Sequence, residues 1–195
     1  SLQFTSIDAG SETFRNGNAI RGVCLAESDL PAGVDGDVVL VVSESSYYEF
    51  SAIDGFDFTK AVFDTSTSLD SSQSYSGIAF NDTGDKLFTI SRFDNPKIDE
   101  YDLASPFDIG TRSGVVASYP ERATRSEEIE FSANGDKYYE VDSRDNLIRQ
   151  FELSTSFDLS TVGNQTTTGG FSDRDLKGVA FSNDGTVLYG VEIGT

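Results

Sequence analysis

The sequence predicts an all-β fold, a β-propeller of about four blades, each a four-stranded antiparallel sheet. Three landmarks recur in one order at a period of about fifty residues. Each period holds apolar runs separated by turns that contain glycine, which is the pattern of β-hairpins. No segment keeps the i, i+3, i+4, i+7 apolar spacing of an amphipathic helix for three turns.

An apolar tetrad opens each repeat, a turn glycine follows it, and a Phe-Asp pair comes later. The tetrads end at Leu25, Phe80, Phe131 and Phe181, at intervals of 55, 51 and 50 positions. The turn glycines are Gly36, Gly84, Gly135 and Gly185. The Phe-Asp pairs begin at Phe56, Phe107 and Phe157. Three landmarks at one period indicate a tandem repeat.

The first half of each repeat predicts a hairpin. In the second repeat an apolar strand, 77–80, leads through the polar turn 81–85 to a second apolar strand, 86–90. Gly84 supplies the positive φ that such a turn often needs, and Asn or Asp side chains bond the local backbone. The later repeats have equivalent turns at 132–136 and 182–186.

The second half of each repeat predicts two further strands. Aromatic and β-branched residues fit a half-buried pleated surface. They recur in the third strand, as Ile98, Tyr101 and Leu103 in one repeat and as Ile148, Phe151 and Leu153 in the next. The Phe-Asp motif then turns the chain into a weaker strand such as 113–119. Four short strands in about fifty residues are typical of a propeller blade.

The hairpin segments 132–139 and 182–189 resemble the S-x-D-G-x-x-L-Y hairpin of YVTN-type β-propellers. The longer unit, with its tail at 152–161, is similar to repeat arrays in marine bacterial and phage proteins. The resemblance covers nearly the whole chain and implies a propeller fold. It implies little about activity, because propellers host lactonases, sialidases, lectins and scaffolds alike.

At 195 residues the chain fits one domain, 1–195, because a single blade cannot bury both its faces. The repeat units fall at about 20–75, 76–126, 127–176, and 177–195 together with 1–19. The last unit stops before its third strand, and segment 2–7 would complete it in a closed four-bladed monomer. The alternative is an array cut from a longer protein, which self-associates through open blade edges.

The net charge of −19, from 14 basic and 33 acidic residues, argues against nucleic-acid binding and against docking on an anionic membrane. No apolar run is long enough for membrane insertion. The acidity indicates either solubility, as in a saline medium, or a cation-binding surface. Cys24 is the lone cysteine, so no internal disulfide forms, and we expect it to pack as a small hydrophobe.

The sequence contains no histidine, which excludes Ser-His-Asp and Cys-His triads, histidine-ligated zinc and a histidine general base. We therefore assign no catalytic residue and expect no cofactor. Calcium stays open, because the acidic turns 81–85 and 142–146 carry several oxygen donors. Both turns lack the EF-hand spacing, so capping of each turn by its own side chains is the favoured interpretation.

Residues that precede the innermost strands converge on one mouth of a propeller's central channel. In this sequence they are Arg21, Ser76, Glu127, Glu128 and Lys177. The favoured interpretation is a set of ion pairs that closes the channel, and the alternative is a pocket for a small ligand or metal. In lactonase-like propellers this mouth holds a calcium ion, which two cations would oppose in this chain.

Tyrosine side chains are the other candidates for contacts with a sugar or a protein partner. Tyr47, Tyr48, Tyr75 and Tyr119 lie near predicted strand ends or loops. Such side chains either pack in the sheet or, where exposed, stack on sugars or bind a protein partner.

We expect a non-enzymatic propeller used for recognition or structure, binding a glycan or a protein at a cell or virion surface. An extracellular, periplasmic or virion location is therefore favoured. The alternative from another class is a calcium-dependent, lactonase-like hydrolase with its site at the channel mouth. A third hypothesis is a fragment whose one property is assembly.

Overall fold

The computed structural model describes residues 22–26, 37–43, 46–52, 61–68, 73–92, 97–120, 125–168, 175–182 and 185–193, with side chains between 73 and 191. Three four-stranded sheets and one two-stranded sheet make up almost all of these residues. Every described strand pairing is antiparallel. No helix in this part of the chain is both long and apolar enough to cross a membrane.

Each sheet runs in chain order. Blade 1 contains β1 (Gly22–Ala26), β2 (Asp37–Ser43), β3 (Ser46–Ala52) and β4 (Ala61–Ser68). Blade 2 contains β5 (Tyr75–Phe80), β6 (Lys86–Ser91), β7 (Lys97–Leu103) and β8 (Arg112–Pro120). Blade 3 contains β9 (Ser126–Phe131), β10 (Lys137–Asp142), β11 (Leu147–Leu153) and β12 (Val162–Thr167). Blade 4 contains β13 (Asp175–Phe181) and β14 (Leu188–Ile193).

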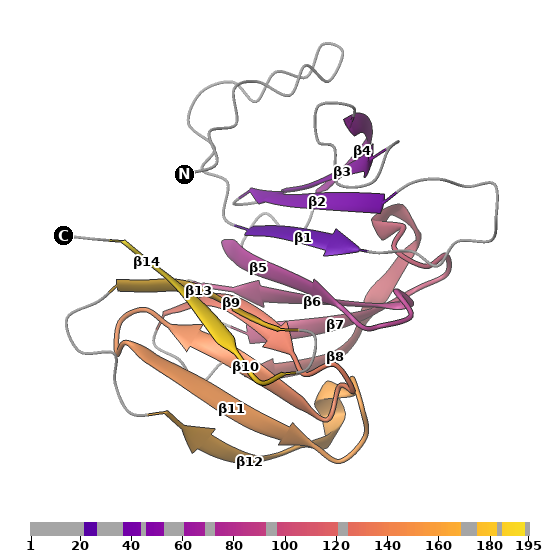
Figure 1. Ribbon diagram of the computed structural model, residues 1–195. Coiled ribbons are helices and arrows are strands. Elements are labelled where there is room, and N and C mark those ends of the chain that lie inside the picture. Colours follow the sequence, from indigo (N-terminus) through magenta and orange to yellow (C-terminus); the bar gives the residue numbers. More distant parts are fainter. Residues whose placement is uncertain are drawn as a thin grey trace.

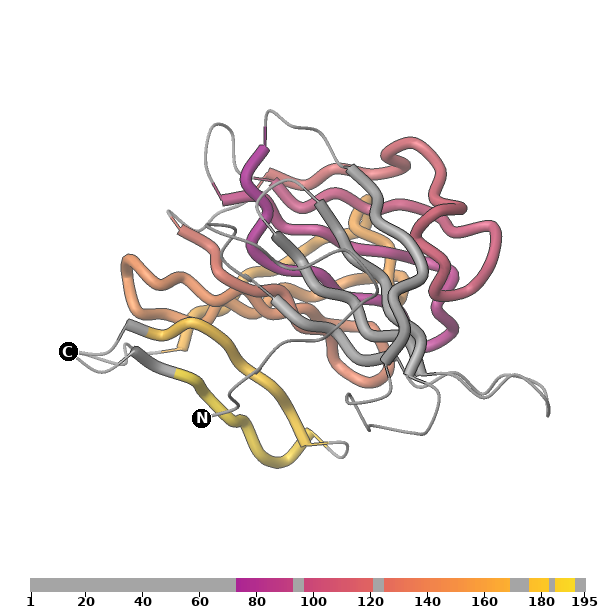
Figure 2. Tube along the Cα trace, turned by 90° about the horizontal axis from the view of Figure 1, so that it is seen from above, coloured from indigo at the N-terminus to yellow at the C-terminus, as the bar shows by residue number. Residues whose placement is uncertain are grey.

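The first strands of the blades pack on one another. β5 contacts β1 on one side and β9 on the other, and β9 also contacts β13. Figure 1 shows β5–β8 between the sheet β1–β4 and the sheet β9–β12. In Figure 2 the yellow strands β13 and β14 lie at the margin of the body. Sheets that meet through their first strands are blades of a propeller, so the predicted fold class, with an incomplete last blade, is confirmed.

The described blades form an open arc. Among the described elements, neither β13 nor β14 has substantial contacts with blade 1. The segment predicted to complete the last blade, 2–7, lies outside the described residues. Closure of the ring and the division into repeat units therefore stay predictions.

The predicted turn glycines have the backbone that the sequence indicated. Gly84, Gly135 and Gly185 have φ of 70°, 68° and 68°. The amide of each donates to the carbonyl oxygen three residues earlier, at 3.2, 2.8 and 2.7 Å. Positive φ favours glycine, because a Cβ atom there meets the following carbonyl group.

The Phe-Asp motif closes each complete turn from the same blade. Phe107 and Phe157 have φ of 61° and 54°, and their amides donate to the carbonyl oxygens of Gly84 and Gly135 at 2.8 and 3.0 Å. A Cβ atom on either glycine would overlap the phenylalanine ring. We call these two pairs the Phe–Gly contacts. Around Gly185 of blade 4 no described atom lies within 4 Å of that position.

The aspartates of the motif begin short 3-10 helices. Asp108 and Asp158 each accept a hydrogen bond at 2.9 Å from the amide two residues later. They cap η2 (Ile109–Thr111) and η3 (Leu159–Thr161). Each cap fixes the path from the third strand to the fourth.

The core lies between the blades and is rich in aromatic rings. All six residues predicted to define the third strand are buried, namely Ile98, Tyr101, Leu103, Ile148, Phe151 and Leu153. The rings of Tyr138 and Phe151 stack at 4.6 Å within blade 3. The Phe131 ring lies 4.4 Å from the Phe88 ring, which joins the cores of blades 2 and 3.

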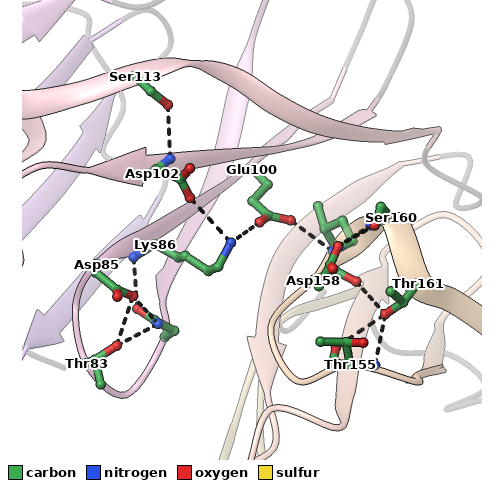
Figure 3. Close-up of polar contacts among 12 residues, drawn as sticks. Thr83, Asp85, Lys86, Glu100, Asp102, Ser113, Thr155, Asp158, Ser160 and Thr161 are labelled. Atoms are coloured by element: carbon green, nitrogen blue, oxygen red, sulfur yellow. Dashed lines mark hydrogen bonds and ion pairs between the residues drawn. The ribbon is translucent and has the colours of Figure 1, made fainter.

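A buried carboxylate ties blade 2 to blade 3 at the outer strands. Figure 3 shows Glu100 between Lys86 of its own blade and the η3 turn of the next. One Glu100 oxygen pairs with the Lys86 ammonium group, and the other accepts a hydrogen bond from the Leu159 amide at 2.9 Å. Asp102 lies 3.4 Å from the same ammonium group, but its side chain is 58% exposed.

Replacing Glu100 by alanine is expected to lower the free energy of unfolding by about 2 kcal/mol, because the buried Leu159 amide loses its acceptor. Asp102→Ala removes a carboxylate from the same lysine, but from an exposed position, and is expected to cost less than about 0.5 kcal/mol. Urea unfolding of both variants measures the difference. Equal costs would mean that Glu100 does not join the two blades.

Blade 4 exposes side chains that other blades bury. Leu188 and Tyr189 are 39% and 60% exposed, whereas the equivalent Leu87 and Phe88 of blade 2 are fully buried. The outer strands that cover the equivalent residues in blades 2 and 3 have no counterpart beside β14 among the described residues. The apolar surface of this hairpin is therefore uncovered on its outer side.

Candidate functional site

Matching hydrogen bonds gather polar residues at one end of the inner strands. The Arg92 amide, just after β6, donates to the Ser74 carbonyl oxygen at 2.7 Å. In the next blade, the Ser143 amide, just after β10, donates to the Arg125 carbonyl oxygen at 3.1 Å. Each bond ties the turn after the second strand to the residue before the first. The side chains of these turns therefore lie at the predicted channel mouth.

One carboxylate oxygen at this mouth lies close to a hydroxyl group and to three cationic side chains. Oε1 of Glu127 accepts a hydrogen bond from Ser143 Oγ at 2.6 Å. The same oxygen lies 2.8 Å from Arg92 Nη2, 3.1 Å from Lys177 Nζ and 3.5 Å from Arg125 Nε. We call these five residues the Glu127 cluster. It joins blades 2, 3 and 4 at the ends of their inner strands.

The interior of the Glu127 cluster is shielded from water. The side chains of Glu127 and Arg92 are 7% and 5% exposed, and that of Lys177 is 21% exposed. The Arg125 side chain, 43% exposed, is the part of the cluster most open to solvent. Charged contacts are stronger in such a partly buried place than at an open surface.

The sequence-predicted site residues separate into three groups. Glu127 and Lys177, fifty positions apart, meet in the cluster as the ion-pair interpretation expected. Ser76 is buried and donates through Oγ to the Ser126 carbonyl oxygen at 3.0 Å, so it joins the inner strands of blades 2 and 3. Arg21 lies outside the described residues.

Glu128 lies away from the Glu127 cluster, at the interface of blades 3 and 4. Its Oε2 accepts a hydrogen bond from the Val179 amide at 2.8 Å and occupies the space where Gly178 would carry a Cβ atom. Glu130, two residues further along β9, is also largely buried. Burial raises the pKa of Glu128 to about 7. Burial, together with the nearby Glu128, raises the pKa of Glu130 to about 7.

Three members of the Glu127 cluster were missed by the sequence analysis, namely Arg92, Arg125 and Ser143. The repeat alignment held a signal for two of them. Arg92 and Ser143 occupy equivalent positions, directly after the second strand of successive blades. Aligning that turn as well as the inner strand would have brought both to the mouth. Arg125 directly precedes β9, whereas Glu127, the residue that the sequence placed before this strand, lies two positions further along and inside it.

The acidic turns are held by their own side chains. Asn81 Nδ2 donates to Asp85 Oδ1 at 2.6 Å and to Thr83 Oγ1 at 2.8 Å. The bond from Asn81 lowers the pKa of Asp85. In the other turn, Asp142 accepts from two backbone amides and pairs with Arg149. Among the described residues, no three His, Cys, Asp or Glu side chains are grouped as metal ligands.

The described side chains of the Glu127 cluster do not favour calcium. Arg92, Lys177 and Arg125 lie within 3.5 Å of the Glu127 carboxylate, the one acidic group of the cluster. A divalent cation would be repelled by three positive charges and would need more oxygen ligands than one carboxylate and one hydroxyl group supply.

The tyrosines described at strand ends pack rather than project. Tyr75 is 2% exposed and belongs to the core of blade 2. Tyr119 of β8 meets Phe151 of blade 3 edge-on at 6.1 Å. The prediction that Tyr75 could stack on a sugar is therefore wrong, because its ring is buried in the core. The side chains of Tyr47 and Tyr48 lie outside the described part of the chain.

Comparison with solved structures finds β-propellers. A protein from Bacteroides uniformis assigned as a 6-phosphogluconolactonase superposes with a TM-score of 0.59 at 14% identity, over 89% of this chain and 47% of its own. The Cps50 (Swd1) β-propeller domain of Myceliophteria thermophila gives 0.53 at 13%, over 81% and 49%. A Chaetomium thermophilum Polycomb Repressive Complex 2 structure gives 0.59 at 14%, over 88% and 36%.

These likenesses establish the fold alone, since the identities are low. The chain spans between about a third and a half of the length of the solved chains that it matches. No family model matches the sequence, and no curated protein does. The resemblance to YVTN-type propellers and to marine bacterial and phage arrays stays a prediction.

Proposed function

We propose that this β-propeller is a non-enzymatic recognition module that binds a protein partner through the channel mouth where the Glu127 cluster lies. The observation that carries the proposal is the cluster itself. It places three cationic side chains from successive blades around one buried carboxylate. A preorganised group of charges on rigid strands is suited to positioning a partner.

Two further considerations favour binding over catalysis. The chain has no histidine, so the common triads and histidine bases are absent. The solved propellers that resemble it include chains of a named multiprotein complex, Polycomb Repressive Complex 2. A glycan ligand, the other class expected from the sequence, is an outcome that the experiment below separates from a protein.

A lactonase-like hydrolase is the less supported alternative. Such an activity would need calcium at the mouth, and the charges of the Glu127 cluster oppose a cation there. An extracellular, periplasmic or virion-surface location remains our expectation for the module.

Arg125→Gln combined with Lys177→Gln is expected to lower partner binding at least tenfold, because it removes two of the three cations at the mouth. The wild-type and variant chains serve as paired baits, and each captured protein is then purified and titrated by calorimetry. The control is Arg112→Gln, which removes a positive charge at the first residue of β8, outside the Glu127 cluster.

A glycan array, read with the same three chains, reports on carbohydrate binding. Partners that bind the double variant as well as the wild type would place recognition elsewhere. Hydrolysis of a lactone by the wild-type chain would overturn the assignment as a non-enzyme.

A further inference from the structure

We propose that the Glu127 cluster is an oxyanion site, in which Arg125 presents its two terminal amino groups to a single carboxylate or sulfate group of the ligand. The proposal rests on the proposed function, since it names the chemistry that the channel mouth recognises. The expected ligand presents one exposed carboxylate or sulfate group to the site, not a run of acidic residues.

The orientation of Arg125 is the first observation. Its Nε is buried and lies 3.5 Å from Glu127 Oε1, yet the side chain as a whole is 43% exposed. Nε makes no hydrogen bond to Glu127, but it is the buried end of the planar guanidinium group, so the edge formed by the two Nη atoms is the end that extends toward solvent. No described residue bonds either Nη atom of Arg125. This edge has the spacing that holds two oxygens of a carboxylate or sulfate.

The support behind Arg125 is the second observation. Glu127 is fixed by Ser143 Oγ at 2.6 Å and by the buried Arg92 at 2.8 Å, and this fixed negative charge attracts the Arg125 guanidinium group through an ion pair at 3.5 Å. These contacts reduce the side-chain entropy that an isolated surface arginine loses when it binds a ligand. Arg125 is therefore preorganised.

The local charge is the third observation. Arg92, Arg125 and Lys177 are three of the chain's 14 basic residues, and they share one carboxylate in a protein whose net charge is −19. A partly buried concentration of positive charge attracts an anion at short range. At longer range the acidic surface repels polyanions, which is why a single oxyanion group is the favoured ligand.

The experiment is an NMR titration of the wild-type chain with sodium sulfate and, separately, sodium acetate, each against sodium chloride at equal ionic strength. We expect saturable shifts of the Arg125 side-chain Nε–Hε signal and of the Ser126 and Ser143 amides. A dissociation constant on the order of 1–10 mM is expected, because one charge-assisted pair of contacts is involved. The acetate and sulfate arms show which oxyanion shape the site prefers.

Arg125→Gln is expected to weaken this binding at least tenfold, whereas Arg112→Gln, which removes the same charge at the far end of a blade, leaves it within twofold. Equal weakening by both variants would mean that the anion responds to net charge alone. Shifts no larger than those with chloride would overturn the oxyanion site. A protein partner whose binding still depended on Arg125 and Lys177 would then leave the recognition module standing, so the two proposals fail separately.

Discussion

Wild-type stability is expected to fall between about pH 4.5 and pH 7, and replacing both Glu128 and Glu130 by glutamine is expected to remove up to roughly 3 kcal/mol of that loss for each carboxyl group. The double variant is therefore expected to be the more stable protein at pH 8. This is a large effect for two side chains, and it arises because both carboxyl groups are partly removed from water, Glu128 at the interface with blade 4 and Glu130 beside it on β9.

The sign follows from the direction of the pKa shifts. Burial raises the pKa of both groups from 4.5 to about 7, so the folded chain holds these protons over a pH range in which the unfolded chain releases them. The favourable contribution is complete below pH 4.5 and is lost as the pH rises through about 7. Glutamine stays neutral, and the carboxamide that replaces the Glu128 carboxyl group keeps an acceptor oxygen for the Val179 amide.

Urea unfolding from pH 4 to pH 9 measures the effect as the difference between wild type and double variant. The remaining acidic residues are common to both proteins, so their contributions cancel. Glu152→Gln, at an exposed position on β11, is the matched control and is expected to leave the pH profile unchanged. Parallel profiles for wild type and double variant would show that the carboxyl groups are hydrated in the folded protein.

Gly135→Ala is expected to lower the free energy of unfolding by about 3 kcal/mol, three times the cost of Gly185→Ala. Both glycines have φ of 68°, so each alanine bears a backbone strain of about 1 kcal/mol. At Gly135 the new Cβ atom also overlaps the ring of Phe157, which must leave its place in the core. Overpacking of this kind costs a further 1–3 kcal/mol or so.

The two substitutions form a controlled pair, because nothing described lies within 4 Å of the Cβ position at Gly185. Urea unfolding compares them, and near-ultraviolet circular dichroism reports whether the aromatic packing around Phe157 has changed. Equal destabilisation would mean that the Phe–Gly contact contributes nothing beyond the backbone of its turn.

The blade architecture could be predicted from the sequence because the same strand and turn signals recur at one period. The turn glycines, the third-strand residues such as Tyr101 and the edge strand at 112–120 all follow from apolar alternation and turn chemistry. The Phe-Asp landmark was correctly expected to turn the chain into the fourth strand, but its contact with the glycine turn was not predicted. That Phe157 adopts positive φ and covers Gly135 depends on a contact between two turns about twenty positions apart, which local pattern does not contain.

The candidate site was predicted in part. Position within the repeat brought Glu127 and Lys177 together correctly, since equivalent residues of successive blades are neighbours. The same reasoning grouped Glu128 with them, although adjacent residues of a strand face opposite sides. Glu128 instead enters the space above Gly178. The presence of Arg125 in the cluster depends on the direction in which its side chain points, and an alignment of the repeats does not give that direction.

The interfaces between blades also decide how cooperatively the protein unfolds. Because the main contacts between the described sheets join blades that are neighbours in the chain, the described part of the molecule resembles a linear array in which each unit is coupled to the next. The coupling is uneven: aromatic rings join blades 2 and 3, whereas the Glu128 carboxyl group lies between blades 3 and 4 with Glu130 beside it on β9. Because the raised pKa values mean that protonation favours the folded interface, we expect the final hairpin to unfold together with the body more readily at low pH than at high pH.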